Sequence, residues 1–303
     1  MRTMTPAHRP VLDDTTAGTV AVGDRRLRRL GFGAMRVAQA RDRRGECGRD
    51  AAVELVLAVR DRGVQFFDTA NIYGLGASEE ILAAALAPYA EDVVVATKAG
   101  FQPGTLKPGQ RMLPPRGRPE HIREDCEQSL RRLKTDCIDL YQVHVPDPGV
   151  PWAETVGAFA DLQRTGKVRL IGVSNVTLDQ LREAQRIVEV ASVQNRYSVG
   201  DRRSETVLDA CERDGIAFLP WAPMIGVEGR PVAPVVDSIA AARGASGQQV
   251  ALAWLLQRSP SILPIPGTSQ LTHADDNVDA AWLRLTDEEL SRLDIARPVQ
   301  GQP

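Results

Sequence analysis

Short apolar runs alternate along this chain with segments of helical periodicity. The runs are continuous, without polar residues at every second position, which is typical of parallel strands buried on both faces. The segments between them have the length and spacing of helices, and no break in composition or linker interrupts the series. The pattern predicts one parallel α/β domain with strands at residues 30–34, 65–68, 93–98, 138–144, 168–174, 192–195, 216–220 and 262–266.

Two architectures fit eight strands that alternate with helices. A doubly wound open sheet would need a G-x-G-x-x-G phosphate turn after its first strand. Residues 31–36, Gly-Phe-Gly-Ala-Met-Arg, lack the third glycine and open no helix. The sequence therefore favours a (β/α)8 TIM barrel. Residues 19–30 predict an N-terminal β-hairpin that turns at Gly23 and Asp24. Residues 1–18 have no periodicity and predict a flexible tail, which leaves 19–303 as the barrel domain.

Several helices carry start signals. Asp50 is expected to cap a helix that stops at Gly63, and Pro119 to open a helix that runs to Leu133. A capping box, in which the first side chain and the one three residues later satisfy each other's backbone amides, is predicted at Thr177 with Gln180, Ser246 with Gln249, and Thr286 with Glu289.

Composition excludes several classes of partner. Lys and Arg total 37 against 39 acidic residues, so a net charge of −2 gives no electrostatic reason to expect nucleic acid or an anionic membrane. The four cysteines, at 47, 126, 137 and 211, form no metal-ligating cluster, and we expect no metal site. With no signal peptide or membrane span predicted, a cytoplasmic protein is expected, as a monomer or weak homo-oligomer.

Polar residues stand where the predicted strands end. Asp68, Lys98 and His144 close the second, third and fourth strands. In a barrel these ends converge on the carboxyl mouth, where barrel enzymes place their active sites. A lysine at a strand end often only extends into water, and a histidine there is often structural. Those interpretations weaken as such residues accumulate on consecutive strands, as they do with Ser174, Asn175, Gln194, Asn195 and Trp221.

Residues 67–74, Phe-Asp-Thr-Ala-Asn-Ile-Tyr-Gly, resemble the F-D-T-A-x-x-Y-G signature of aldo-keto reductases. Further short motifs follow in the family's order at 96–98, 143–147, 172–175, 193–195 and 265–277, so the resemblance covers about residues 19–296. It implies a barrel enzyme that passes hydride from a nicotinamide cofactor to a small-molecule carbonyl. The implied catalytic tetrad is Asp68, Tyr73, Lys98 and His144.

The chemistry fits these residue types. A phenol with a pKa of ~10 is a reluctant acid near neutrality. A nearby ammonium stabilises the phenolate and lowers that pKa, which is the role expected of Lys98. Asp68 would hold Lys98 and balance its charge, and His144 would donate a hydrogen bond that orients the substrate oxygen beside Tyr73.

The resemblance also implies a cofactor site. Ser174, Asn175 and Gln194 would bind the nicotinamide carboxamide, and Trp221 would stack on the ring where the family more often has Tyr or Phe. At the adenosine end, Gly267 and His273 replace the Lys and Arg that recognise the 2′-phosphate in many members, and Asp276 replaces Glu. NADPH is still expected, with NADH tolerated. The remaining implied contacts are Gly33, Met35, Asp68, Ala222, Pro223, Ile265, Thr268, Ser269 and Asn277.

The segments 214–220 and 250–269 resemble the bacterial branch that contains pyridoxal reductases. That likeness implies pyridoxal or another aromatic aldehyde as the substrate. Alternatives are a specialised ketoreductase for sugar or polyketide carbonyls and a redox-sensing subunit with little turnover. Substrate selection is expected from the long loop 99–118, the segment 224–234 and Trp152.

Overall fold

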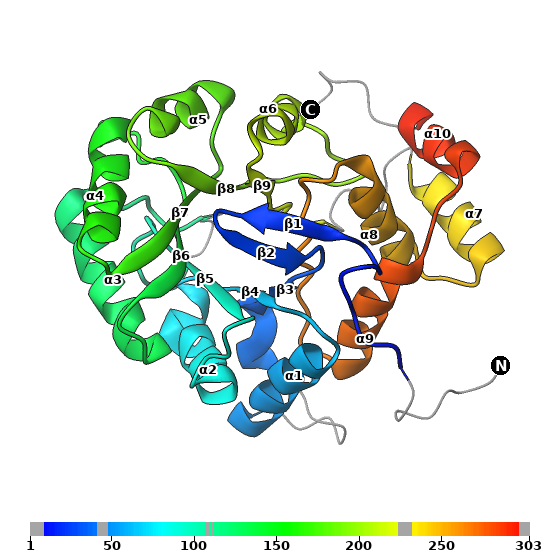
Figure 1. Cartoon of the computed structure of the whole chain (residues 1–303), viewed down its shortest axis with the longest axis horizontal. Helices are drawn as coiled ribbons and strands as arrows, with labels where there is room; N and C mark the ends of the chain where they lie inside the picture. The colour runs from blue at the N-terminus through cyan, green and yellow to red at the C-terminus, as the bar shows by residue number, and fades with distance from the viewer. Residues whose placement is uncertain (1–8, 41–47, 107–109, 111, 224–231, 297–303) are drawn as a thin grey trace.

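The computed structural model describes residues 9–40, 48–106, 110, 112–223 and 232–296. Its centre is a parallel sheet whose seven strands lie in chain order, and helices surround it (Figure 1). This is the predicted barrel. The strands are β3 (Phe32–Gly33), β4 (Phe66–Asp68), β5 (Val94–Ala99), β6 (Ile138–Val143), β7 (Val168–Ser174), β8 (Val190–Gln194) and β9 (Ala217–Phe218).

The expected eighth strand, residues 262–266, is an extended segment that pairs on both sides. Ile262 forms a parallel bridge with Phe218 of β9. On its other side, the amide of Gly31 donates to the carbonyl of Pro264 at 2.9 Å. Pro264 and Pro266 have no N–H to donate, so the ladder stays incomplete. The segment nevertheless joins the last strand to the first and closes the sheet.

The helices cover the outside of the sheet. The three predicted capping boxes and the helix from Pro119 to Leu133 are confirmed. The expected cap at Asp50 is wrong, because Gly48 occupies the N-cap and Asp50 lies in the first turn. The main helices are α1 (Arg49–Asp61), α2 (Ala77–Leu86), α3 (Pro119–Leu133), α4 (Trp152–Arg164), α5 (Leu178–Gln185), α6 (Glu205–Asp214), α7 (Ala233–Arg243), α8 (Gly247–Arg258), α9 (Leu271–Asp279) and α10 (Asp287–Ile295).

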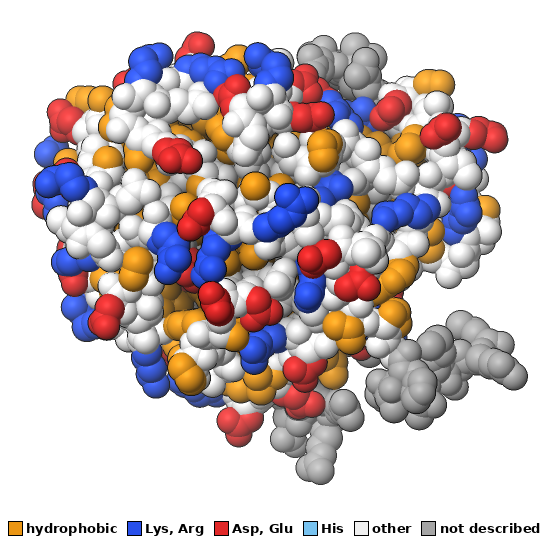
Figure 2. All heavy atoms as spheres, in the orientation of Figure 1, with side chains coloured by type: hydrophobic (Ala, Val, Ile, Leu, Met, Phe, Trp, Pro, Cys, Tyr) orange, Lys and Arg blue, Asp and Glu red, His pale blue; other side chains and the backbone are white. Residues whose placement is uncertain are grey.

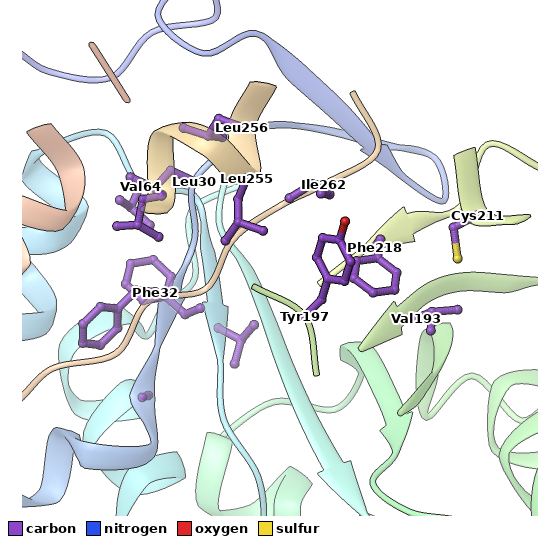
Figure 3. Close-up of a cluster of buried hydrophobic side chains, with 14 of the residues drawn as sticks. Leu30, Phe32, Val64, Val193, Tyr197, Cys211, Phe218, Leu255, Leu256 and Ile262 are labelled. Carbon is purple, nitrogen blue, oxygen red and sulfur yellow. The ribbon is translucent and has the colours of Figure 1, made fainter. Parts of the chain in front are cut away.

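The shorter helical turns are η2 (Ala34–Gln39), η3 (Tyr73–Gly76) and η4 (Ala280–Trp282). Apolar side chains fill the layer between the strands and the helices. Figure 3 shows Leu255 and Leu256 of α8 beside Leu30 and Val64, all members of one buried cluster. This continuous apolar layer fixes each strand, and therefore each strand end, relative to its neighbours.

The predicted hairpin is formed by β1 (Thr19–Val22) and β2 (Arg25–Arg28), which pair antiparallel and turn at Gly23 and Asp24. It lies across the centre of the ring of strands in Figure 1. Val20, Val22 and Leu27 belong to the same buried cluster as inward-facing residues of β4, β5 and β6. The hairpin thus closes the amino end of the barrel, and the carboxyl end is left for the site.

Residues 9–18, part of the expected flexible tail, pack against the barrel. Leu12 is buried, and its amide donates to the carbonyl of Arg62 at 2.9 Å. Arg9 donates to Asp279 of α9 at 2.9 Å. The tail boundary at residue 18 is therefore wrong for this part, because single buried side chains and ion pairs leave no periodic signal. Residues 1–8 lie outside the described residues.

Charged side chains of both signs are interspersed over the face in Figure 2, in agreement with the near balance of charge in the sequence. Within the described part of the chain, no helix combines the length and apolar character that crossing a bilayer requires. The same residues contain no group of three or more His, Cys, Asp or Glu placed to hold a metal ion.

Candidate active site

A buried ion pair lies at the ends of β4 and β5. The Nζ of Lys98 is 2.6 Å from Oδ2 of Asp68, and it donates a second hydrogen bond of 2.7 Å to the carbonyl of Thr69. Lys98 is fully buried and Asp68 nearly so. The other carboxylate oxygen, Oδ1, accepts from Gln194 at 2.8 Å and from Gln142 at 3.2 Å. Charge and hydrogen-bonding capacity are thus satisfied, as a buried pair requires.

Tyr73 faces this pair from the turn after β4. Gly74, Leu75 and Gly76 all have positive φ, and this tight turn carries the chain from the strand end into α2. The Nζ of Lys98 lies 5.2 Å from the centroid of the Tyr73 ring, and its charge acts on the phenol. The sequence-predicted acid and its ammonium partner are therefore brought together.

The sequence predicted a lowered pKa for Tyr73, whereas in the structure its pKa is raised. Burial raises it above 10.0, the adjacent Lys98 charge and hydrogen bond lower it, and Asp68 raises it again. Burial dominates, so the net shift is upward, although Lys98 acts in the expected sense. Tyr73 is consequently a neutral phenol at physiological pH, which is the form that can deliver a proton.

His144 closes the site from the position directly after β6. Its ring meets that of Phe101 edge-on at 4.7 Å and that of Tyr73 at 5.9 Å. Burial and the charge of Lys98 hold its pKa well below 6.5, so the imidazole is neutral. Its Nδ1 is buried with no partner among the described residues. A buried unpaired N–H costs ~1–3 kcal/mol, so we infer the tautomer that keeps its proton on Nε2.

Because His144 is neutral, its imidazole is not expected to titrate as the pH falls through 6.5. The measurement is an NMR titration of the imidazole Cε1–H signals, with His144 assigned by the signal missing from His144→Gln. The His144 shift should stay constant down to about pH 5.5, one unit below the ordinary histidine value. A transition centred near 6.5 would show that Lys98 and burial do not control this group.

The three side chains expected at the nicotinamide carboxamide lie together at the ends of β7 and β8. Asn175, at φ 58°, donates to the carbonyl of His144 at 2.9 Å and to Oγ of Ser174 at 3.0 Å. Its Oδ1 accepts from Nε1 of Trp221 at 3.0 Å. Gln194 is engaged with Asp68. The expected carboxamide contacts are thus hydrogen-bonded to one another and, through Gln194, to the catalytic pair. A bound carboxamide would replace some of these hydrogen bonds with its own.

Trp221 follows β9 and lies beside β8, where its amide donates to the carbonyl of Asn195 at 3.1 Å. The guanidinium of Arg196 lies 5.6 Å from its ring centroid. The next residue, Ala222, has a φ of 53°, and Pro223 is buried. Met35, near the start of the chain on the turn after β3, is 55% exposed. The contact of these residues with a cofactor stays a prediction.

At the expected adenosine end, Gly33 and Gly267 form a close backbone contact. A Cβ on Gly267 would lie 2.5 Å from the carbonyl oxygen of Gly33, and a Cβ on Gly33 would lie 2.7 Å from that of Ile265. A lysine at 267 would therefore require the backbone to move. The backbone as it stands is thus compatible with glycine at this position. His273 is exposed on α9, and Asp276 of the same helix is half-buried.

The residues before and on α9 fit an adenine nucleotide. Thr268 is buried and Ser269 half-buried, and both precede the N-terminus of the helix at Leu271, an end that favours anions. Asn277 is buried, and its Oδ1 accepts from Gln248. Its Nδ2 has no partner among the described residues. An orphaned buried donor of this kind suits an acceptor nitrogen on a ligand.

The long loop after β5 is held together at its base. Phe101 forms an antiparallel bridge with Pro115, and the amide of Arg116 donates to the carbonyl of Gly100 at 2.7 Å. Arg116 also donates to Asp125 of α3 at 2.9 Å. The base thereby fixes Phe101 against the histidine of the site. Residues 107–109 and 111 of the loop lie outside the described residues.

One residue of the site was missed from the sequence, and one expectation stays a prediction. The indole of Trp152 donates to the carbonyl of Gln180 at the start of α5, and its part in substrate selection stays a prediction. Gln142 of β6 was missed, although it stands two residues before His144, which directly follows the strand. Alternation along a strand places both on one face, so period-two spacing from His144 is the signal that could have found it. Residues 224–231 of the segment expected to select substrate lie outside the described residues.

Fold and site together define a barrel enzyme of the oxidoreductase class, with an acid, an ammonium, a carboxylate and an imidazole at its mouth. The chain belongs to the aldo/keto reductase family, whose family model matches residues 29–298. It is 38% identical over 284 residues to an uncharacterized oxidoreductase of Schizosaccharomyces pombe, which covers 93% of this chain and 91% of that protein.

Two further relatives carry named properties. Pyridoxine 4-dehydrogenase of Escherichia coli is 35% identical over 286 residues, covering 92% of this chain and 98% of that protein. The crystal structure of an aldo/keto reductase from Klebsiella pneumoniae in complex with NADP and acetate has a TM-score of 0.77 at 27% identity. That match covers 94% of this chain and 97% of the other.

Proposed function

We propose that this protein is an NADPH-dependent carbonyl reductase that converts an aldehyde or ketone to an alcohol, with pyridoxal or another aromatic aldehyde as the candidate substrate. The observation that carries the proposal is the buried pair of Lys98 and Asp68, with the Nζ of Lys98 lying 5.2 Å from the centroid of the Tyr73 ring. The pyridoxine dehydrogenase relative supports the aromatic aldehyde. The NADP complex of the Klebsiella enzyme supports the cofactor.

The residues have separate tasks in this proposal. When bound, the nicotinamide supplies hydride to the carbonyl carbon. Tyr73 gives its phenolic proton to the carbonyl oxygen, and Lys98 stabilises the phenolate that is left. The Nε2–H of His144 donates to the same oxygen and orients it. Proton transfer from a positioned acid of this kind contributes about 10²–10⁴ in rate. Asp68 keeps Lys98 in place and compensates its charge.

Ser174, Asn175 and Gln194 would hold the carboxamide, and Trp221 would stack on the ring and exclude water from one of its faces. Thr268, Ser269 and the start of α9 would receive the adenosine phosphates, and Asn277 would contact adenine. We propose NADPH over NADH, with NADH tolerated. The same proposal has the enzyme act in the cytoplasm on a small-molecule carbonyl, as a monomer or weak homo-oligomer.

His273→Arg is expected to lower KM for NADPH about tenfold and leave KM for NADH nearly unchanged, since a guanidinium adds charge-assisted hydrogen bonds to a 2′-phosphate. The exposed position on α9 accepts the longer side chain without repacking. Steady-state kinetics with both cofactors measure the effect. His121→Arg, on α3, is the matched control. If KM changed equally for both cofactors, residue 273 would not contact the 2′-phosphate.

A substrate screen that follows NADPH absorbance tests the proposed function. Pyridoxal, other aromatic aldehydes and a panel of sugar and aliphatic ketones are compared by kcat/KM. The aromatic aldehydes are expected to be the better substrates. Negligible turnover of pyridoxal with rapid ketone reduction would favour the specialised ketoreductase. An absence of turnover across all carbonyls at saturating cofactor would favour a redox-sensing role. Efficiency favouring NADH by about tenfold or more would overturn the NADPH preference.

A further inference from the structure

A chain of polar side chains runs through the barrel interior behind the catalytic pair. The hydroxyl of Ser192 on β8 donates to Oε1 of Gln142 on β6 at 3.3 Å. The amide nitrogen of Gln142 donates to Oδ1 of Asp68 on β4 at 3.2 Å. Ser192 and Gln142 are both fully buried. The interior of a barrel is otherwise filled by apolar side chains, so this polar chain calls for a reason beyond packing.

The strand between β6 and β8 leaves room for this row of polar side chains. Gly172 of β7 pairs with both Gln142 and Ser192 across the sheet. A Cβ on Gly172 would lie 2.3 Å from Oγ of Ser192 and 2.9 Å from Cγ of Gln142. Three neighbouring strands therefore combine to place one amide donor against the catalytic carboxylate.

We infer that Gln142, held by Ser192, is a positioning residue for proton transfer by Tyr73, acting through Asp68 and Lys98. This inference rests on the proposed function. Gln142 spreads part of the negative charge of Asp68 onto its amide and prevents the carboxylate from rotating. The Nζ of Lys98 then keeps its position beside Oδ2 of Asp68, and its positive charge continues to stabilise the phenolate of Tyr73.

Gln194 donates to the same oxygen, but it differs from Gln142 in one respect. Gln194 lies at the end of β8 among the side chains proposed to hold the carboxamide, so cofactor binding competes for its amide. Gln142 lies one position further into its strand, and its side chain bonds to Asp68 and Ser192, both within the barrel. It is therefore the donor that stays on Asp68 when the cofactor is bound.

The test is Gln142→Met, which keeps the length of the side chain and removes its donor. Without that donor, more negative charge remains on Asp68 and Lys98 is held less firmly, and both effects disfavour the Tyr73 phenolate. We expect kcat for carbonyl reduction at neutral pH to fall about tenfold, with KM for NADPH within about twofold. The apparent pKa of kcat for alcohol oxidation, which needs the phenolate, should rise by about one unit.

Tyr141→Phe is the matched control. Tyr141 is the neighbour of Gln142 on β6 but faces outward, where its ring packs 4.8 Å from that of Phe159 in α4. Its buried hydroxyl has no partner among the described residues. The control therefore also removes one polar group from a fully buried position of the same strand. It should retain wild-type kcat and pH profile.

A second readout does not depend on turnover. The ultraviolet absorbance of the Tyr73 phenolate, taken as the difference from Tyr73→Phe during alkaline titration, should have a higher midpoint in Gln142→Met than in wild type. A wild-type enzyme without carbonyl turnover would defeat the proposed function, but this titration would still decide the role of Gln142. An unchanged phenolate midpoint in a folded Gln142→Met protein would reduce Gln142 to a packing residue and overturn the inference.

Discussion

Tyr73→Phe is expected to lower kcat for carbonyl reduction by about 10²–10⁴-fold, because phenylalanine keeps the ring and removes the proton donor. The Kd for NADPH should stay within about twofold, since Lys98 and Asp68 are the charged groups that act on the hydroxyl and the proposed function gives it no contact with the cofactor. Single-turnover absorbance measurements give the rate of the chemical step, and quenching of tryptophan fluorescence gives the Kd.

Tyr89→Phe provides the control for this change. Its hydroxyl donates to the carbonyl of Leu133 at 2.6 Å, beside the start of β5 and so at the opposite end of the barrel. It should keep wild-type kcat although it loses a real hydrogen bond. If Tyr73→Phe kept its turnover, or if both variants lost it equally, Tyr73 would not be the proton donor.

Lys98→Met is expected to combine loss of activity with a large loss of stability. Removing one partner of a buried ion pair leaves an uncompensated charge, at a cost of ~3–5 kcal/mol in the free energy of unfolding. Here the orphan would be Asp68, whose Oδ2 loses its 2.6 Å contact. Urea unfolding measures the stability, and kcat should fall by at least as much as in Tyr73→Phe.

Asp68→Leu combined with Lys98→Met separates the two effects. With both charges gone, an apolar pair of similar volume should restore most of the lost stability, because desolvation of the ions is no longer required. Activity should not return, because no ammonium remains beside Tyr73. Two results would contradict the view that the ion pair is retained for catalysis although an apolar pair would pack as well. One is a Lys98→Met variant as stable as wild type, and the other is a double variant that recovers turnover.

Three members of the predicted tetrad carry local signals in the sequence, whereas Tyr73 was predicted from the resemblance. Asp68, Lys98 and His144 each end an apolar run, and parallel strand ends converge at one mouth whatever the details of packing. The hairpin turn at Gly23 and the three capping boxes are similarly local, and the structure contains all of them. Residue type and spacing were sufficient there.

Other features depend on contacts between distant residues. The upward pKa shift of Tyr73 results from burial, which no motif reports. The approach of Gly267 to Gly33 joins positions at opposite ends of the sequence. The packing of Leu12 on the barrel depends on one buried side chain. Hydrophobic periodicity carries no information about any of these, and only the folded chain defines them.

The bridge between Phe101 and Pro115 has a consequence for how the enzyme could change over evolution. A loop whose two ends are already joined loses little entropy when its tip is lengthened, since each doubling of length costs only ~0.6 kcal/mol. Insertions or replacements beyond the bridge would leave Phe101 and His144 in their edge-on contact. New selectivity could then be acquired by exchanging the tip alone, with the proton-transfer apparatus inherited intact.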